Sequence, residues 1–315
     1  MNRNNVLIGV GLHRDDVYNL AVPARAGESH PSTLDTRAGG CAFNTAAGLS
    51  VAGRGVVHAG VRGADASGLE LAAALRGRGI EDAGLVIEGE ATGRYAALLE
   101  PDGSVAMAAA AMNIYERAEE LAQHGPFRNA IAKADVVVLD ANAPAGAVAR
   151  LTLGRRADAM LVLLATSPAK VGRLGAVLNE ADVLFGNEAE WEALEAIGRI
   201  PRLAFVTSGA RGAELRVGGK VVARRVAMQA RIDNVIGAGD AFAAGTLHAF
   251  MDGTGPEEAM NTGLDWAARC VASPTALGWL DDTFGRRARE RARGRTTGRM
   301  TNDWSRDKGR ATSKG

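Results

Sequence analysis

Short apolar runs alternate with helix-like segments along most of the chain. The apolar runs are rich in Val, Leu and Ile, and their lengths are typical of strands. They predict strands at 6–10, 56–59, 135–139, 160–164, 182–185 and 203–207. Apolar residues at helical spacing predict helices at 42–52, 68–76, 238–251 and 256–273. Because apolar strands separated by helices favour a parallel sheet that is covered on both faces, we predict an α/β fold.

Two hairpins interrupt this alternation of strands and helices. In the first, the turn Pro101-Asp102-Gly103 separates strands at 94–100 and 104–109, and in the second, two strands flank Gly218-Gly219. A polar segment also leads from the first strand to Gly40. The polar segment and the first hairpin together predict a small β lid, inserted into a domain of residues 1–284 at about 15–38 and 92–110.

Charge separates the end of the chain from this domain. The net charge is +1 over 315 residues, but residues 285–315 alone carry +8, which leaves −7 on residues 1–284. The basic tail has few large apolar residues, so burial cannot offset the entropy lost on ordering it, and we predict that it is disordered. A solvated extension is favoured over contact of the tail with nucleic acid.

Composition excludes several classes of protein. The two cysteines, Cys41 and Cys270, form neither a disulfide framework nor a CxxC metal site. No apolar run approaches the length of about 18 residues that a membrane span requires, so we expect a cytoplasmic protein without membrane contact. The sequence also lacks the motifs GxxxxGK(S/T), HExxH and GxSxG, and this absence excludes the P-loop route to phosphate chemistry.

The strongest candidate for a catalytic site is Gly237-Ala238-Gly239-Asp240, at the start of a predicted Ala-rich helix. Such a turn directs several backbone N–H groups at one point, and the helix dipole adds partial positive charge there, so the segment predicts an anion hole. Asp240 beside it is placed to take a proton from a hydroxyl that attacks phosphorus. The structural alternative is a tight turn with an acidic residue that the dipole favours.

A second motif, Asn187-Glu188-Ala189-Glu190, directly follows a predicted strand. Asn187 and Glu190 have the spacing of a helix capping box, which needs no ligand. The same pair at the carboxyl end of a strand is suited to help hold hydrated Mg²⁺ near phosphates. Taken alone, the motif favours the capping box.

Two glycine-containing segments are further candidates for ligand contact. Thr207 opens a turn with Gly209 and Gly212, and this turn either lets the backbone approach a nucleotide or forms a simple corner. Gly40 precedes a predicted helix in which Asn44 is a polar residue on an Ala-rich surface. An Asn in that place often only caps the helix or binds backbone.

In order and spacing, these motifs resemble the ribokinase-like (PfkB) family of carbohydrate and nucleoside kinases. The resemblance covers roughly residues 5–280 and includes a strand followed by an Asp, GGxxxN, the lid hairpin, NxxE, VTxG and GAGDAFxAG. It implies a three-layer α/β/α fold with a mainly parallel central sheet and a small β lid. It also implies a kinase that uses ATP and Mg²⁺, takes a small nucleoside or sugar, and forms a homodimer through the lid strands.

The resemblance also implies a role for each motif. Asp240 is the expected catalytic base, beside an anion hole formed by Gly237, Ala238 and Gly239. Glu190 is expected near Mg²⁺ and Asn187 near the phosphates. ATP is expected against the turn of Thr207, Gly209 and Gly212. The hydroxyl groups of the substrate are expected against Asp16, Gly40 and Asn44.

Within the family, the sequence is similar to bacterial pseudouridine kinases in the segments Thr92-Gly93-Arg94-Tyr95, Ala111-Met112-Asn113-Ile114 and Asn234-Val235. This similarity implies phosphorylation of the 5′-hydroxyl of pseudouridine, with Asn113 as a candidate acceptor for the base. The alternatives are a kinase of another nucleoside or free sugar, and a non-catalytic nucleoside sensor. Asn234 and Ile236 replace the Asp and Thr of many relatives near a monovalent-cation site, which puts K⁺ activation in doubt.

Overall fold

The computed structural model describes residues 5–281 and 284–285 of the chain. Apart from Gly285, the predicted disordered tail at 285–315 lies outside the described residues. Within them, no helix has both the length and the apolar character that a membrane span requires.

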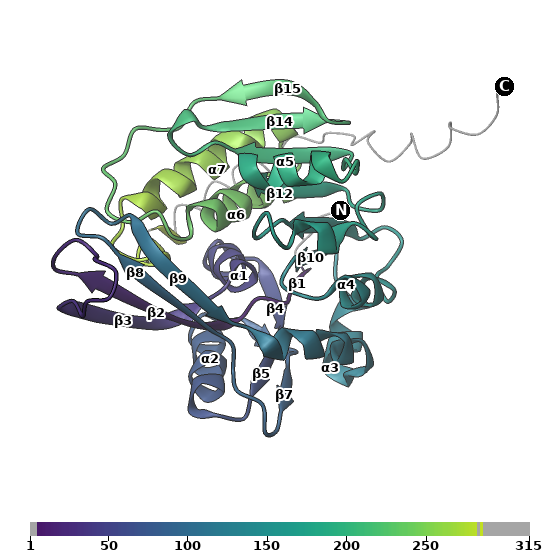
Figure 1. Cartoon of the computed structure of the whole chain (residues 1–315). Helices are drawn as coiled ribbons and strands as arrows, with labels where there is room; N and C mark the ends of the chain where they lie inside the picture. The colour runs from purple at the N-terminus through teal and green to yellow at the C-terminus, as the bar shows by residue number, and fades with distance from the viewer. Residues whose placement is uncertain (1–4, 282–283, 286–315) are drawn as a thin grey trace.

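A nine-stranded sheet forms the middle layer of the molecule (Figure 1). The strand order is β15-β14-β13-β12-β11-β10-β1-β4-β6, and neighbouring strands from β13 to β6 are parallel. β14 and β15 add the second predicted hairpin in antiparallel pairing. The strands are β1 (Asn5–Gly9), β4 (Gly55–Ala59), β6 (Glu81–Asp82), β10 (Val136–Asp140), β11 (Met160–Leu164), β12 (Val183–Asn187), β13 (Leu203–Thr207), β14 (Ala213–Val217) and β15 (Lys220–Arg225). The prediction of a mainly parallel sheet is therefore confirmed.

Helices cover both faces of this sheet. Alternate residues of a strand face opposite layers, so Val6 and Ile8 of β1 lie in one core and Leu7 in the other. The first core packs against α1 (Cys41–Val51), α2 (Ala66–Gly77), α6 (Ala238–Met251) and α7 (Pro256–Val271). The second packs against η1 (Asn113–Gln123), α3 (Gly125–Ile131), α4 (Ala145–Thr152), η2 (Val171–Leu174) and α5 (Glu188–Ala196). Burial on both faces explains why the strands are continuous apolar runs.

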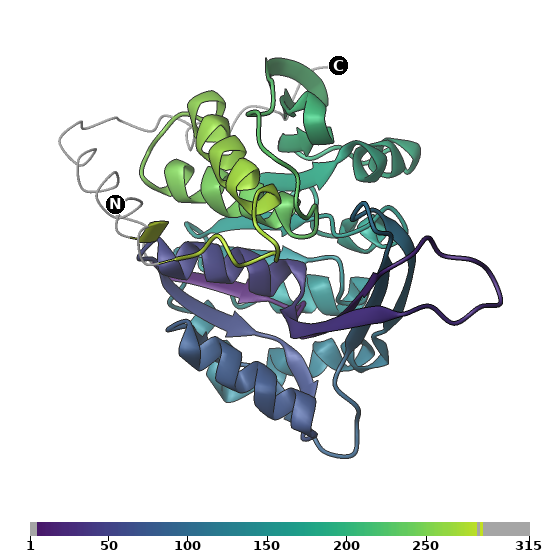
Figure 2. The same cartoon turned by 90° about the vertical axis from the view of Figure 1, so that its left-hand side faces the viewer.

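A separate four-stranded sheet extends from one side of the central layers and forms the predicted lid (Figure 2). Its order is β3-β2-β8-β9, with bounds Ser32–Gly39, His13–Leu20, Arg94–Leu99 and Val105–Ala111. The polar segment before Gly40 thus forms part of the lid as two strands. The sequence did not indicate these strands individually, because many residues of β3 are exposed and polar. The short strands β5 (Val61–Gly63) and β7 (Leu85–Ile87) pair separately.

Candidate active site

The start of α6 is shaped by a glycine that no other residue replaces without strain. Gly237 has the left-handed φ of 85°, and a Cβ built on it would lie 2.7 Å from Cβ of Ala276. The backbone then turns so that Ala238, Gly239 and Asp240 form the first helical turn. N–H groups of a first turn have no carbonyl partner within the helix, and the dipole makes this end positive. The structure thus brings the N–H groups of this first turn beside the Asp240 carboxyl, and among them the Ala238 N–H donates to the Val235 carbonyl oxygen at 3.4 Å.

The Asp240 carboxyl lies against the N-terminal part of α1. Asn44 Nδ2 donates a 2.8 Å hydrogen bond to Asp240 Oδ2, and the Cys41 thiol donates a second hydrogen bond to the carboxyl. Burial raises the pKa of Asp240 to about 7, against the lowering effect of these two donors. The negative charges of Asp140 and Asp15 add to the rise. A carboxyl with this pKa changes its protonation state near neutral pH, as a general base requires.

The two glycines before α1 create room for the lid. A Cβ on Gly39 would overlap the Asp15 carboxylate, and a Cβ on Gly40 would overlap the carbonyl oxygen of Gly11. Gly40 also has a φ of 110°, which side chains with a Cβ rarely adopt. The pair therefore brings the N-terminus of α1, with Asn44, directly beneath the lid strand that carries Asp15. The carboxylates of Asp15 and Asp240 then share one site.

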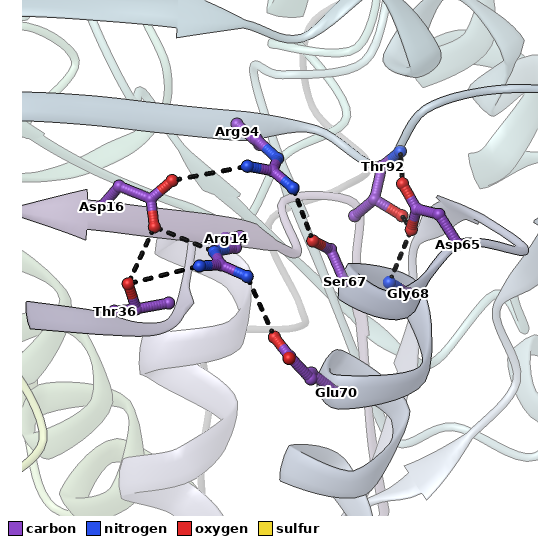
Figure 3. Close-up of polar contacts among 9 residues, drawn as sticks. All are labelled: Arg14, Asp16, Thr36, Asp65, Ser67, Gly68, Glu70, Thr92 and Arg94. Carbon is purple, nitrogen blue, oxygen red and sulfur yellow. Dashed lines mark hydrogen bonds and ion pairs between the residues drawn. The ribbon is translucent and has the colours of Figure 1, made fainter.

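The structure places Asp15 toward this site and Asp16 on the opposite face of β2. Asp16 Oδ1 accepts hydrogen bonds from Arg14 Nε at 2.8 Å and Thr36 Oγ1 at 2.9 Å, and Arg94 lies 3.7 Å from Oδ2 (Figure 3). Burial disfavours the charge of Asp16, but these donors outweigh it and lower its pKa. Since successive residues of a strand face opposite sides, two adjacent aspartates cannot both face Asp240. The sequence predicted Asp16 as the contact to the substrate, but the carboxylate that faces the site is that of the preceding residue, Asp15.

Asn187 and Glu190 form a complete capping box at the start of α5. Asn187 Oδ1 accepts from the Glu190 N–H at 2.9 Å, and Glu190 Oε2 accepts from the Asn187 N–H at 2.8 Å. The Glu190 side chain is buried, and burial raises its pKa. The capping box predicted from the sequence is therefore formed. It uses only one carboxylate oxygen of Glu190, so the other oxygen is left for contact with a metal ion.

The turn after β13 lies beside this capping box. Thr207 is the register partner of Asn187 in the parallel pair of β12 and β13, so the two residues end neighbouring strands. Gly209 and Gly212 have φ values of 55° and 102°, and a Cβ on Gly212 would overlap the carbonyl oxygen of Arg225. The turn therefore depends on glycine at both positions.

Aromatic packing connects these strand ends to helix α6. Phe185 of β12 and Phe205 of β13 stack with ring centroids 5.1 Å apart. Phe242, in α6, packs edge-on against both rings at 6.2 and 6.3 Å. The contact fixes the start of α6 relative to the carboxyl ends of β12 and β13, so the predicted base and the predicted nucleotide residues lie at one edge of the sheet.

Asn113 is exposed at the start of η1. The preceding Met112 lies against Gly93 at the base of the lid strand β8. After strand β11, Lys170 donates a 2.8 Å hydrogen bond to Asn142 Oδ1. Sequence reasoning missed several polar residues that the structure brings to the site: His13, Asp15, Cys41, Tyr115 and Asp140.

Sequence comparison identifies the relatives of this chain. Residues 14–279 match the pfkB family carbohydrate kinase. The chain belongs to the pfkB family of carbohydrate kinases. A pseudouridine kinase of Escherichia coli (strain K12) is 30% identical over 245 residues, which cover 72% of this chain and 77% of that protein. This pfkB-family member is therefore a phosphotransferase that acts on a hydroxyl group of a sugar or nucleoside.

Solved structures of kinases share the fold. A carbohydrate kinase from Agrobacterium tumefaciens is 31% identical, with a TM-score of 0.76 over 91% of this chain and 97% of that chain. A ribokinase from Thermotoga maritima is 19% identical, with a TM-score of 0.75 over 93% and 99%. An Arabidopsis thaliana ribokinase complexed with ribose and ATP is 21% identical, with a TM-score of 0.74 over 92% and 99%. The ribokinase-like fold predicted from the motifs is confirmed.

Proposed function

We propose that this pfkB-family kinase transfers the γ-phosphoryl group of ATP to the 5′-hydroxyl of pseudouridine. The observation that carries the phosphoryl-transfer chemistry is the Asp240 carboxyl, with a pKa of about 7, inside the anion-binding turn of α6. The similarity to a pseudouridine kinase supports the choice of substrate. An intact base argues against a non-catalytic nucleoside sensor, because binding alone needs no proton acceptor.

The residues at the start of α6 account for the chemical step. As the substrate oxygen forms its bond to the γ-phosphorus, the bond from that phosphorus to the ADP oxygen breaks. Asp240 takes the proton that the attacking hydroxyl loses, and Asn44 holds the carboxylate by the 2.8 Å hydrogen bond. The turn formed by Gly237, Ala238 and Gly239 offers N–H groups and the positive helix end to the transferred phosphoryl group.

Glu190, on the nucleotide side of the site, is suited to contact Mg²⁺. Among the described residues there is no group of three or more His, Cys, Asp or Glu that could hold a metal ion by itself. This agrees with Mg²⁺, which is usually bound by one or two carboxylates together with substrate phosphates and water. Glu190 is the proposed residue, with Asn187 nearby, and bound Mg²⁺ would neutralise charge on the triphosphate.

We do not extend the proposal to activation by K⁺. Asn234 Oδ1 accepts from the Ile236 N–H at 3.0 Å, and Asn234 Nδ2 donates to the Ile236 carbonyl oxygen at 3.3 Å. The side chain thereby closes its own turn, and it carries no charge that would attract a cation.

ATP and the substrate would occupy different sides of Asp240. We place ATP against the turn of Thr207, Gly209 and Gly212, where the space beside Gly209 is open and lets a nucleotide approach the backbone.

The lid side would hold the nucleoside. Asp15 is the proposed acceptor for ribose hydroxyls, in the role that sequence reasoning gave to Asp16, with Gly40 and Asn44 beneath it. Tyr95 of β8 is the register partner of Asp15 and is partly buried, so its ring offers an aromatic surface for a planar base. This feature favours a nucleoside over a free sugar such as ribose or fructose, which is the second candidate. Asn113 is the proposed contact to the base.

The lid also supports the proposal of a homodimer. All seven residues of the edge strand β9, from Val105 to Ala111, are exposed, and all are apolar. On the opposite edge, Leu34 of β3 is exposed as well. An uncovered apolar edge strand is an unusual surface for a monomer, and a second copy of the lid would cover it.

The function is tested by incubating the protein with pseudouridine, ATP and Mg²⁺ and identifying the product. Mass spectrometry is expected to show one added phosphate, and phosphorus–proton coupling in NMR is expected to place it on the 5′-oxygen. The Asp240→Asn variant serves as the matched control and is expected to form little product. Formation of a sugar phosphate from ribose or fructose, with none from pseudouridine, would move the assignment to the second candidate.

A further inference from the structure

A continuous chain of buried polar groups leads from the backbone to Asp15. The Leu12 N–H donates to the Tyr115 hydroxyl oxygen at 2.9 Å. That oxygen lies 2.8 Å from His13 Nδ1, and His13 Nε2 lies 3.2 Å from Asp15 Oδ1. Tyr115 is 1% exposed, Asp15 5% and His13 9%. Water is thus nearly excluded from this chain of polar groups, so that each polar contact within it matters more than it would at the surface.

The carboxylate at the end of the chain fixes the direction of the other links. An ionised carboxylate oxygen can only accept, so the interaction of His13 Nε2 with Asp15 Oδ1 at 3.2 Å requires a proton on Nε2. In neutral imidazole, Nδ1 then carries no proton and accepts from the Tyr115 hydroxyl. The oxygen of that hydroxyl accepts in turn from the Leu12 N–H. Tyr115 thus supports the tautomer that presents an N–H to the carboxylate.

Asp15 needs such a donor. Its Oδ1 atom is buried and, among the described residues, has no aligned hydrogen-bond partner. His13 Nε2 is the cationic or donor atom within ion-pair distance of it. The carboxylate itself lies where a Cβ on residue 39 would stand, so glycine at that position makes room for Asp15. A buried carboxylate with few donors is costly, and it is retained where a ligand supplies the missing hydrogen bonds.

We propose that His13, with its Nε2–H tautomer supported by Tyr115, is a positioning residue that orients Asp15 toward the hydroxyl groups of the substrate's sugar. The inference rests on the proposed function, because it takes Asp15 as the sugar contact. His13 acts through Asp15 on the bound substrate, before the reaction begins. It does not contact the proton that Asp240 takes up. Its loss therefore weakens binding of the nucleoside more than it slows turnover or weakens binding of ATP.

Three variants test this role by steady-state kinetics with saturating ATP. His13→Leu removes the donor, and the KM for the nucleoside is expected to rise about 10- to 100-fold, the range of a hydrogen bond to a charged group. His13→Gln keeps an N–H near the position of Nε2 and is expected to restore most of the affinity. Tyr115→Phe frees the tautomer and is expected to give an intermediate KM. Tyr18→Phe, on the outer side of β2, is the matched control and is expected to leave KM unchanged.

A double-mutant cycle separates positioning from simple support of the fold. If His13 acts through Asp15, adding His13→Leu to Asp15→Asn produces little further rise in the nucleoside KM. The inference would be overturned if His13→Leu raised the nucleoside KM equally in the wild-type and Asp15→Asn backgrounds. It would also be overturned if His13→Leu raised the KM for ATP as much as the KM for the nucleoside. Calorimetric binding of the nucleoside without ATP repeats the cycle where turnover is too low to measure.

The proposed function fails in a different way. In that case, the wild-type protein phosphorylates no nucleoside, whatever the state of residue 13. If the wild-type protein instead phosphorylates another hydroxyl compound, the same cycle is measured with that compound. The inference about His13 then stands or falls on the non-additivity alone.

Discussion

Replacing Asp240 by Asn separates the catalytic use of this carboxyl from its effect on stability. The change keeps the shape of the side chain, and Asn44 can still donate to the new amide oxygen. The proton acceptor is lost, so kcat is expected to fall by at least about 10² and up to about 10⁴. In the wild-type protein, a pKa of about 7 means that kcat rises between pH 6 and 8 as the carboxyl loses its proton.

Stability is expected to change in the opposite direction. The carboxyl has a pKa of about 7 when folded and 3.8 without perturbation, so proton binding favours the folded state. That contribution is complete below pH 3.8 and is lost as the pH rises through about 7. Above that pH, the ionised Asp240 carboxyl destabilises the folded state by at most about 4 kcal/mol. The actual cost is smaller, because the carboxyl keeps some contact with water. Asn never ionises, so the variant should be more stable than the wild type at pH 8.

Thermal unfolding at pH 4 and pH 8 measures this difference. The Tm of Asp240→Asn is expected to exceed that of the wild type at pH 8 by about 2–4 °C for each kcal/mol gained, and to match it near pH 4. Asp265→Asn is the control, because its carboxylate forms a surface ion pair with Arg269. A near-wild-type kcat in the Asp240 variant would exclude Asp240 as the base, and a lower Tm at pH 8 would exclude an ionised carboxyl that destabilises the folded state.

Three further predictions concern the same site and the tail. Cys41→Ala removes a thiol donor that lowers the pKa of Asp240, so the acid limb of the kcat–pH profile is expected to move to higher pH. Glu190→Gln keeps the capping box with Asn187, so the Tm should hold while the Mg²⁺ concentration for half-maximal rate rises; a fall in Tm alone would favour a purely structural Glu190. Deletion of residues 286–315 is expected to leave kcat unchanged and to weaken salt-sensitive binding to polyanions; loss of turnover in a folded truncated protein would show that the tail reaches the active site.

The sequence predicted the central sheet and helix α6 well, because their signals are local. Apolar runs buried on both faces define the strands, and glycines before an Ala-rich segment define the start of α6 at Ala238. The lid strands β2 and β3 were harder to predict. Their polar residues form ion pairs on the outer face, as Arg14 and Asp16 do, so no apolar alternation marks them.

Long-range contacts account for the rest of what the sequence left open. Nothing local distinguishes Asp15 from Asp16, and only the pairing register of β2 decides which carboxylate faces inward. Tyr115 meets His13 across 102 residues of sequence, on η1, which was not predicted as a helix. Such contacts depend on how the lid packs on α1, and this packing cannot be predicted from the spacing or the type of the residues.

The proposed substrate is tested by the ratio of kcat/KM for pseudouridine to kcat/KM for uridine. Pseudouridine has a ring N–H that uridine lacks, because its glycosidic bond is made to carbon. An acceptor in the site that pairs with this N–H stays unpaired when uridine binds, and the cost corresponds to at least about tenfold. The account predicts a ratio of about ten or more, with little turnover of free hexoses. A ratio near one or below, or turnover of ribose or fructose without turnover of pseudouridine, would contradict it.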